Sequence, residues 1–345
     1  MVKPTTKDLA KAAGVSLATI DRVLNARLGV RQATVARVQN AIKEIGFVRD
    51  LAAANLARSK EYRLVFLLPD HDDEFIDLVK EAIAEADRSL AHERTNVSII
   101  RAPSNNPHRI ADALDNLSGD QVDGVAIMAP ETPQVRDSIA RLDDRGIAVV
   151  AFVSHQMTSP TAYYVGINNK AAGQTVGKLM GRFTGEQQGN VLVLTESMQS
   201  RDSQERRLGF DCVMAQYAPR LSVCPSMESY GDPVRAAKIV KAALESQQTV
   251  AGIYLMNHDI RETMQAIIAQ GTPQQTVIVG HELTPQTRAQ LIEGTMDAVI
   301  TQDVGHLVRS SIRLLRAKAS QVETLASQER IRIEIILREN MPEEI

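Results

Sequence analysis

The chain has 345 residues, 44% hydrophobic and 23% charged, a composition typical of a globular protein with two or three domains. No apolar run approaches the roughly 18 residues of a membrane span, and the first residues lack the apolar core of a secretion signal, so neither a membrane protein nor an exported one is expected. The net charge of −3 is unevenly distributed. Residues 1–60 hold eleven Lys and Arg against four Asp and Glu, which gives a net charge of +7, and the remaining residues carry a net charge of −10. A basic head on an acidic body is typical of a nucleic-acid-binding module joined to another domain.

The head begins with a segment, Thr5 to Asn25, that predicts two short helices around a tight turn. Thr5 is placed to cap the first helix, with Asp8 three residues later in a capping-box arrangement. Gly14 supplies the backbone freedom for the turn, and Ser16 is placed to cap the second helix.

The second helix has an inner and an outer face. Ile20, Val23 and Leu24 recur at i, i+3 and i+4 and are expected to face inward. The outer face then carries Leu17, Ala18, Asp21 and Arg22. In a helix-turn-helix protein the first turn of such a helix contacts base edges in the major groove, so the sequence predicts DNA binding.

A third helix is expected to complete the head and to end at Gly46. Its apolar face consists of Val35, Val38, Ile42 and Ile45. Residues 1–48 are therefore predicted to be a helix-turn-helix domain. Residues 49–61 follow as a hinge whose helix-forming part has only about two turns, which is marginal in isolation and suits a switch element.

From Tyr62 onward, predicted strands alternate with predicted helices. The first series of expected strands is Arg63–Leu68, Val97–Ile100, Val122–Met128, Ile147–Val153 and Tyr163–Ile167. The second is Val191–Thr195, Leu221–Val223, Val250–Met256, Thr276–Gly280 and Ala298–Thr301, and Arg330–Leu337 forms a late strand near the lobe junction.

This alternation predicts an α/β sensor, residues 62–345, of two doubly wound parallel-sheet lobes behind the all-α head. Lobe one is expected at about 62–168 and 305–325, and lobe two at about 169–304 and 326–345. Ligands of such folds bind at the carboxyl ends of the strands, between the lobes.

Several sequence words resemble the LacI/GalR family of bacterial transcriptional regulators. In the head these are KDLAKAAGVS, TIDRVLN, residues 30–34, residues 44–47, and Ala53 with Leu56. The body resembles the family's sensor domain, which is similar to periplasmic sugar-binding proteins. Its matching words are residues 165–169, RRLGF with Arg206, Asn257 with Asp259, residues 279–282 and residues 301–303.

The resemblance implies a cytoplasmic homodimer, associated with the nucleoid when it binds a pseudo-palindromic DNA operator. Each recognition helix enters a major groove, and the paired hinge helices enter the minor groove, where Leu56 wedges between bases. Leu17 and Ala18 suit a thymine methyl, and Arg22 suits guanine. The full set of implied DNA-binding residues is Thr5, Ser16, Leu17, Ala18, Thr19, Arg22, Asn25, Thr34, Ala53 and Leu56.

The head departs from the family pattern at three places. Asp21 replaces the usual Ser, and a carboxylate near phosphates is unfavourable unless it is paired. Arg49 and Asp50 replace a common Pro-Asn pair, which should loosen the hinge entry while Asp50 can still cap the helix. Arg31 adds a cation where a small polar residue is usual. The docking mode is therefore expected to carry over, but no operator sequence is implied.

The resemblance also implies a set of effector-binding residues. Their chemistry suits a sugar or polyol, because carboxylates, amides and a guanidinium pair with hydroxyls and an aromatic ring can face an apolar sugar surface. Glu282 stands where Asp is common, so its extra methylene should reshape the pocket. The set is Asp72, Phe75, Glu131 (a weaker addition), Arg206, Asn257, Glu282 and Gln302.

Structural alternatives exist for several of these residues. Phe75 could be core, Arg206 could pair with Glu205 or Asp202 on a helix surface, and Asp72 could belong to a solvated acidic loop. The histidines lack metal-ligand spacing on one element and are expected to be structural, namely His71, His155, His258 and His281. Cys212 and Cys224 also lack such spacing and are expected to be reduced thiols. No metal site is predicted.

The sequence thus predicts a transcriptional regulator, of the repressor type, whose operator affinity is controlled by a small sugar or polyol, with no other cofactor. A doubly wound enzyme is disfavoured, because G-x-S-x-G, Walker and G-x-G-x-x-G motifs are absent and the segment starting at His281 has Pro285 where a zinc-protease helix needs His. A sugar-binding transport receptor would share the body fold but not the basic head. Without a leucine-heptad tail, a dimer is expected in place of a tetramer.

Overall fold

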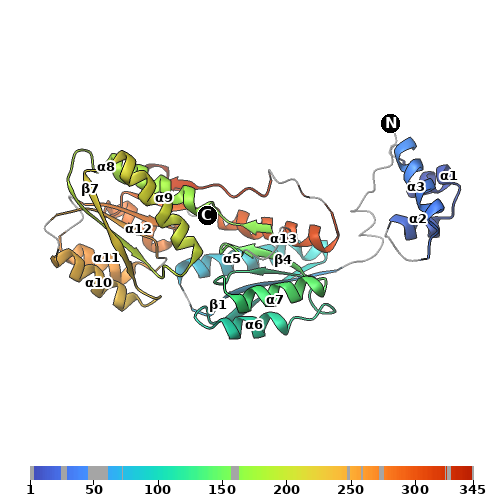
Figure 1. The fold of residues 1–345 in the computed structure, drawn as a ribbon, viewed down its shortest axis with the longest axis horizontal. Coiled ribbons are helices and arrows are strands. Elements are labelled where there is room, and N and C mark those ends of the chain that lie inside the picture. The colour runs from blue at the N-terminus through green and yellow to red at the C-terminus, as the bar shows by residue number, and fades with distance from the viewer. Residues whose placement is uncertain are drawn as a thin grey trace. The chain divides into compact units, whose positions relative to one another are not determined.

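The computed structural model of the protein describes residues 4–24, 29–45, 61–71, 73–156, 163–246, 249–257, 259–271, 276–322, 324 and 328–343 (Figure 1). The chain forms two compact units, Met1–Glu61 and Tyr62–Ile345. The first, here called the head, is helical in its described part. The second, here called the sensor unit, is α/β. No helix in the described ranges is long and apolar enough to cross a membrane.

The described residues of the head form the helices α1 (Thr6–Ala13), α2 (Leu17–Leu24) and α3 (Gln32–Ile45). The predicted capping box is present, because the Thr5 backbone N–H donates to Asp8 Oδ2 at 2.8 Å and the Asp8 N–H donates to Thr5 Oγ1 at 3.4 Å. Gly14 ends α1 with a positive φ of 62°, a conformation that glycine adopts without strain. The predicted helix-turn-helix is therefore confirmed.

The head core forms where the three helices meet. Leu9, Ile20 and Val38 are each at most 1% exposed. The predicted inner face of α2 is confirmed, with Val23 and Leu24 packed at the edge of this core. On α3 the spacing prediction omitted Ala41, which is 3% exposed and packs with Val38. Alanine marks a buried helix face only weakly because it is common on either face.

Lobe one of the sensor unit is built on a parallel sheet in the order β2-β1-β3-β4-β5. Its strands are β1 (Tyr62–Pro69), β2 (Thr95–Ala102), β3 (Gly124–Ile127), β4 (Ala148–Phe152) and β5 (Tyr163–Val165). Its helices are α5 (Glu74–Leu90), α6 (Pro107–Asp115), α7 (Pro133–Asp144) and α13 (Val304–Ala319), with a short 3-10 turn at Ala91–Glu93.

Both faces of this sheet are covered by helices, α5 with α13 on one side and α6 with α7 on the other (Figure 1). Side chains of β1 alternate between the two cores, so Phe66 packs with the α5 side and Val65 and Leu67 pack with the α6 side. Burial on both faces explains why β1 reads in the sequence as a continuous apolar run.

Lobe two has six strands in the order β11-β10-β9-β8-β6-β7. They are β6 (Gly189–Thr195), β7 (Leu221–Glu228), β8 (Val250–Leu255), β9 (Val277–His281), β10 (Ala298–Thr301) and β11 (Glu334–Ile336). Helices α8 (Asn169–Phe183) and α9 (Arg201–Tyr217) pack on one face, and α10 (Pro233–Ser246), α11 (Arg261–Ala269) and α12 (Pro285–Glu293) pack on the other.

The predicted fold class is confirmed, with one refinement at the edge of lobe two. The strand expected at Arg330–Leu337 is shorter, Glu334–Ile336, and it pairs antiparallel with β10. The chain crosses between lobes after β5, after β10 and again before β11. In chain order α13 comes between β10 and β11, but it packs on lobe one, whereas both strands belong to lobe two. A strand that returns from the other lobe does not follow the right-handed crossover that makes neighbouring strands parallel.

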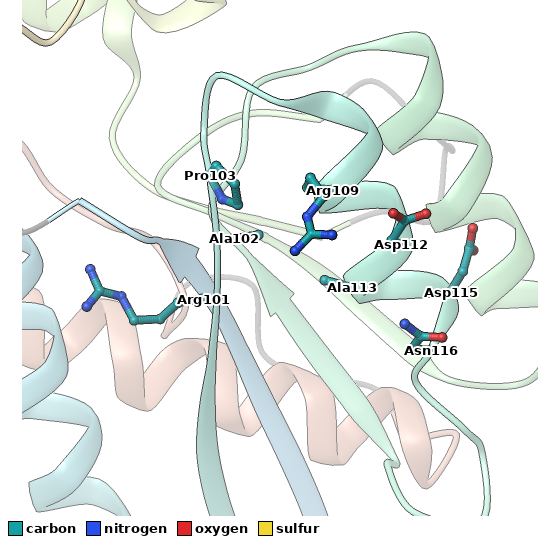
Figure 2. A pocket seen from close by; sticks show the side chains of 8 residues that line it. All are labelled: Arg101, Ala102, Pro103, Arg109, Asp112, Ala113, Asp115 and Asn116. Atoms are coloured by element: carbon teal, nitrogen blue, oxygen red, sulfur yellow. The ribbon is translucent and has the colours of Figure 1, made fainter.

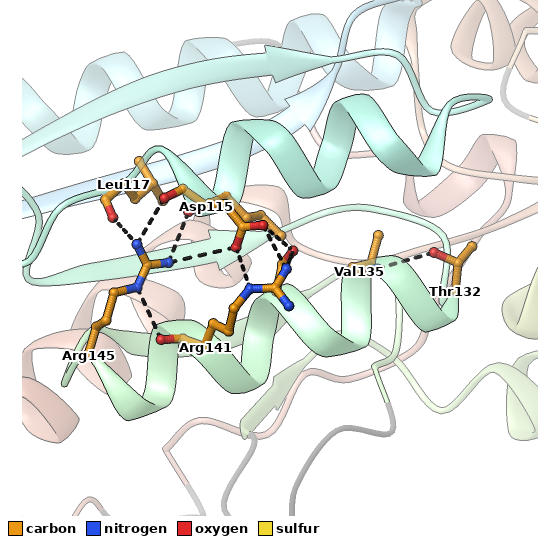
Figure 3. Close-up of polar contacts among 8 residues, drawn as sticks. Asp115, Leu117, Thr132, Val135, Arg141 and Arg145 are labelled. Atoms are coloured by element: carbon orange, nitrogen blue, oxygen red, sulfur yellow. Dashed lines mark hydrogen bonds and ion pairs between the residues drawn. The ribbon is translucent and has the colours of Figure 1, made fainter.

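Figure 3 shows how the two outer helices of lobe one are joined. Asp115 at the end of α6 accepts hydrogen bonds from Arg141 of α7, at 2.6 and 3.0 Å, and from Ser138 at 3.2 Å. Arg145 donates to the carbonyl oxygens of Asp115 and Leu117 at 2.9 and 2.7 Å. The Arg141 hydrogen bond lowers the pKa of Asp115 below its ordinary value. These groups are partly exposed, so the pair adds little to stability and mainly sets the angle between α6 and α7.

Helices α8 and α9 of lobe two pack backbone to backbone. A Cβ atom at Gly173 would lie 1.9 Å from the carbonyl oxygen of Arg206, and one at Gly209 would lie 2.0 Å from the carbonyl oxygen of Lys170. Real Cβ atoms do not approach backbone so closely, so glycine is required at both positions. This contact sets the position of Arg206 relative to the start of α8.

We expect Gly209→Ala to destabilise the sensor unit, because the new methyl group forces α9 away from α8. Overpacking of this kind costs about 1–3 kcal/mol, which should lower the melting temperature by several degrees. Gly181→Ala is the matched control on α8, since its Cβ would meet only the Ala218 side chain at 3.3 Å and alanine favours helix formation. Equal melting temperatures for the two variants, measured by circular dichroism, would contradict the close-packing account.

Candidate functional site

The outer face of α2 carries an exposed apolar pair in its first turn. Leu17 is 47% exposed, and Ala18 beside it is also exposed. Ser16 caps the helix as expected, because the Thr19 N–H donates to Ser16 Oγ at 3.2 Å and the two hydroxyls lie 2.9 Å apart. A solvent-facing leucine at a helix start adds nothing to the head core, which is consistent with a contact surface.

The other predicted DNA-binding residues have varied surroundings. Arg22 is exposed on the outer face of α2, and Thr34 is half-buried in the first turn of α3. The Thr5 hydroxyl is engaged in the capping box, where it donates to Asp8 Oδ2 at 2.7 Å. Three predicted positions lie outside the described residues, namely Asn25, Ala53 and Leu56.

Three of the predicted effector residues follow neighbouring strands of lobe two. Asn257 follows β8, Glu282 follows β9 and Gln302 follows β10, at the carboxyl edge of the sheet. Their exposures are 3%, 1% and 3%. Gln302 Nε2 donates to Glu282 Oε1 at 3.0 Å, and Thr301 Oγ1 donates to Glu282 Oε2 at 3.3 Å. The structure therefore brings Glu282 and Gln302 into direct contact, with Asn257 at the end of β8, the strand on the other side of β9.

Glu282 has an unusual backbone. Its φ is +63°, in the left-handed region that costs a residue with a side chain about 1–3 kcal/mol. Its N–H donates to the Ile300 carbonyl, and its own carbonyl accepts from the Thr287 hydroxyl at 2.8 Å, so the surrounding hydrogen bonds hold this conformation. Strained backbone of this kind is concentrated at ligand sites.

Buried amide groups at the strand ends have a defined polarity. The Asn257 Nδ2 group donates to the Asp259 carbonyl at 2.6 Å, and Gln302 Nε2 donates to Glu282, so the amide nitrogens are occupied. The opposite oxygens, Asn257 Oδ1 and Gln302 Oε1, are buried and have no hydrogen-bond donor among the described residues. Buried acceptors without donors are costly, and both are suited to accept from a bound ligand.

A third amide of this kind lies in lobe one and was not singled out from the sequence. Gln156, after β4, is 4% exposed; its Nε2 donates to the Ala129 carbonyl at 2.5 Å, and no donor among the described residues reaches its Oε1. Gln156 lies in a loop, where the sequence has no periodic pattern that could mark it. Its burial and its unpaired amide oxygen are visible only in the folded structure.

Arg206 is buried on α9, with 6% exposure. Its Nε donates to Asn169 Oδ1 at 2.8 Å. The alternative of a surface pair with Glu205 or Asp202 is wrong, because Arg206 is buried and donates to Asn169, while Glu205 pairs with Arg201 at 2.8 Å. Burial raises the pKa of Asp202, and the charge of Arg206 and the backbone N–H of His155 oppose this increase.

The predicted residues of lobe one lie in other settings. Phe75 is 1% exposed within the lobe-one core, which favours its packing role. Glu131 lies 3.4 Å from Arg136 and 3.7 Å from Arg201 of lobe two. Asp72 lies outside the described residues, as does His258. His281 is structural as expected, since its Nε2 lies 2.8 Å from the Tyr254 hydroxyl.

Glu74 makes a contact between the lobes that was not predicted. It lies in the first turn of α5, and its Oε1 accepts from Arg261 Nη2 of α11 at 2.7 Å. Its Oε2 accepts from the backbone N–H of Gln286 at 2.8 Å. Gln286 is the second residue of α12, where backbone N–H groups lack partners within the helix, so a carboxylate of lobe one caps a helix of lobe two.

A separate hollow of about 390 Å³ lies in lobe one between the end of β2 and α6 (Figure 2). Its lining is strongly polar and includes none of the predicted effector residues. The lining residues are Arg101, Ala102, Pro103, Arg109, Asp112, Ala113, Asp115 and Asn116. Asp115 is already engaged with Arg141, so this hollow does not form part of the strand-end site.

Comparison with known families agrees with this architecture. Residues 5–50 match the bacterial regulatory proteins of the lacI family, and residues 64–321 match the periplasmic binding protein domain. The chain therefore has a helix-turn-helix DNA-binding head of the lacI family of bacterial regulatory proteins, and its sensor unit belongs to the periplasmic binding protein domain family.

Named relatives are transcriptional regulators. The chain is 24% identical over 315 residues to the HTH-type transcriptional regulator AscG of Escherichia coli (strain K12), covering 88% of this chain and 91% of AscG. It is 25% identical over 248 residues to Catabolite control protein A of Staphylococcus aureus (strain MRSA252), covering 70% of this chain and 71% of that protein.

Solved structures share the fold of the sensor unit. GanP, a glucose-galactose binding protein from Geobacillus stearothermophilus, superposes with a TM-score of 0.71 at 20% identity, covering 82% of this chain and 99% of GanP. A periplasmic solute binding protein from Actinobacillus succinogenes 130z with bound D-allose has a TM-score of 0.73 at 14% identity, covering 81% of this chain and 98% of that protein.

We expect Glu74→Ala to weaken the contact between the lobes. The Gln286 amide hydrogen should exchange with solvent about 5- to 10-fold faster, because it loses its acceptor, a partly exposed contact worth about 1 kcal/mol. Glu81→Ala, on the exposed side of the same helix, is the matched control and should leave the exchange unchanged. Hydrogen exchange measured by mass spectrometry checks this, and equal rates in the two variants would contradict the contact.

Proposed function

We propose that this protein is a transcriptional repressor whose operator affinity is controlled by a small neutral sugar or polyol bound between the sensor lobes. The main support is the set of buried polar side chains at adjacent strand ends of lobe two, Asn257, Glu282 and Gln302. Arg206 is a further buried polar residue of the same lobe. A site buried to this degree and fixed by its own hydrogen bonds is suited to recognise one small molecule.

The polarity of the site supports a polyhydroxylated ligand. The unoccupied amide oxygens of Asn257 and Gln302 accept hydrogen bonds, whereas the guanidinium of Arg206 donates them. A hydroxyl group does both, so a sugar or polyol can satisfy the two kinds of group at once. Solved proteins of the same fold include ones bound to D-allose and D-arabinose.

The head supports operator recognition by a homodimer. In the proposed complex α2 enters the major groove, Leu17 and Ala18 contact a thymine methyl, and Arg22 pairs with guanine. The hydroxyls of Thr5, Ser16, Thr19 and Thr34, with the Asn25 amide, contact phosphates and set the register. The hinge residues Ala53 and Leu56 are proposed to enter the minor groove between half-sites.

Control of DNA binding follows from the sensor geometry. In the proposed mechanism, an effector that contacts both lobes acts together with the contact of Glu74 and changes the preferred angle between the lobes. The hinge helices of the proposed dimer then lose or gain their pairing. Such couplings between sites are typically about 1–3 kcal/mol. The effector releases DNA if it favours the lobe angle that separates the hinges, and it acts as a corepressor if it favours the opposite angle. Release and corepression both act on operator DNA, so the proposal includes a cytoplasmic location.

A thermal-shift screen of the full chain against sugars, polyols, sugar phosphates, purines and organic acids tests the ligand class. A ligand that binds the native state alone raises the melting temperature. We expect a shift with a neutral sugar or polyol, and a shift only with purines or organic acids would overturn the proposed class.

We expect Arg206→Ala to abolish the response to such a sugar while leaving operator binding intact. Removing a buried charged donor typically costs at least 2 kcal/mol, or about 30-fold in affinity. Arg207→Ala is the matched control, because the neighbouring guanidinium pairs with Asp211 and Ser226 instead. Calorimetric titration checks this, and unchanged sugar affinity in Arg206→Ala would remove Arg206 from the site.

We expect Arg22→Ala to reduce the preference for the operator over random DNA. A bidentate contact to guanine discriminates against the wrong base by about 1–3 kcal/mol. Lys43→Ala, which removes an exposed cation from the last turn of α3, should weaken binding to both DNAs by the same factor. Fluorescence anisotropy at fixed salt measures the ratio, and an unchanged ratio in Arg22→Ala would contradict base reading by this residue.

A further inference from the structure

Arg206 is the end of a chain of three hydrogen-bonded polar side chains in lobe two, of which Arg206 and Asn169 are buried and Asp202 is half-buried. Its Nε donates to Asn169 Oδ1 at 2.8 Å, and Asn169 Nδ2 donates to Asp202 Oδ1 at 3.1 Å. Asn169 is 2% exposed and is the first residue of α8. Asp202 and Arg206 are four residues apart on α9, so the amide of Asn169 lies between two side chains on one face of the neighbouring helix.

The direction of the chain is fixed by its ends. A guanidinium can only donate and an ionised carboxylate can only accept, so the Asn169 amide has one orientation, with its oxygen toward Arg206 and its nitrogen toward Asp202. Burial raises the pKa of Asp202, whereas the charge of Arg206 and the backbone N–H of His155 lower it.

The backbone beneath these side chains cannot move freely. Gly173 of α8 packs against the carbonyl group of Arg206, and Gly209 of α9 packs against the carbonyl group of Lys170, beside Asn169. The distance between Asn169 and Arg206 is consequently set by main-chain contact, and the hydrogen bond between them follows from it.

We propose that Asn169 and Asp202 are positioning residues for Arg206. They hold its guanidinium in one orientation before a ligand arrives, Asn169 by direct hydrogen bond and Asp202 by fixing the Asn169 amide. This inference rests on the proposed role of Arg206 in effector binding. Arginine has many rotamers, and a side chain that is already ordered loses less entropy on binding, so orientation by Asn169 increases affinity without a direct ligand contact.

A ligand-free measurement tests the orientation itself. In the full chain, the Arg206 Nε–H should exchange slowly in nitrogen-15 NMR, and Asn169→Ala should speed this exchange at least about 10-fold, because its acceptor is lost. Asn168→Ala is the matched control. Asn168 is the exposed neighbour that caps α8 through the Ala171 N–H at 2.9 Å, so its loss should lower the melting temperature but leave the Arg206 proton protected.

Sugar affinity tests the consequence. With whichever of D-allose, D-arabinose and D-tagatose binds the native chain, we expect Asn169→Ala to weaken binding about 10-fold and Asn168→Ala to leave it unchanged. Combined with Arg206→Ala, Asn169→Ala should have no further effect, since the group it orients is gone. Asp202→Asn retains an acceptor for Asn169 and should bind within about 3-fold of the native chain, whereas Asp202→Ala should not.

The outcomes separate the two proposals. Continued protection of the Arg206 proton in Asn169→Ala, or equal sugar affinities in Asn169→Ala and Asn168→Ala, would overturn the positioning role. Failure of all three sugars to bind the native chain would contradict this choice of ligands, and the exchange measurement would still decide the orientation of Arg206. If Asn169→Ala does not fold, the contrast between Asp202→Ala and Asp202→Asn provides the same test.

Discussion

The sensor unit buries a guanidinium, a carboxylate and several amides, Arg206, Glu282, Asn169, Asn257 and Gln302 among them. Polar groups removed from water are tolerated only when hydrogen bonds replace the lost solvation. Arg206 therefore donates a hydrogen bond to Asn169, and Glu282 accepts hydrogen bonds from Gln302 and Thr301. The amide oxygens of Asn257 and Gln302 are buried but accept no hydrogen bond from the described residues, so their lost solvation is not replaced. The candidate site therefore presents hydrogen-bond acceptors at these two positions.

The fold supplies this arrangement through the parallel strands of lobe two. Successive strands deliver Asn257, Glu282 and Gln302 to the same edge, and the glycine contacts between α8 and α9 bring Arg206 to a fixed distance from Asn169. On the other side of the junction, Glu74 of lobe one accepts from the first turn of α12. The candidate site and the contact between the lobes consequently use neighbouring segments, since Glu282 and Gln286 lie four residues apart. A ligand near Glu282 would therefore act close to the contact that joins the lobes.

Much of this fold could be predicted from the sequence because its signals are local. The strands of both lobes are short apolar runs, and the first turn of α2 has Leu17 exposed while Ile20 is buried, as the helical period requires. Contacts between distant segments have no such signal. Glu74 reads as part of an acidic loop, and Asn169 is the first residue of a helix; only the folded chain places them beside Gln286 and Arg206. The strand β11 was predicted, but its antiparallel pairing with β10 was not, for the same reason.

The central claim is that the sensor site and the DNA-binding head are coupled, and coupling is reciprocal. Calorimetric titration of the effector sugar into the full chain, alone and with a saturating operator selected from random duplexes, tests this directly. If the account is correct, the operator changes sugar affinity by the same factor by which sugar changes operator affinity, about 5- to 150-fold for typical couplings. Equal sugar affinity with and without the operator would contradict it.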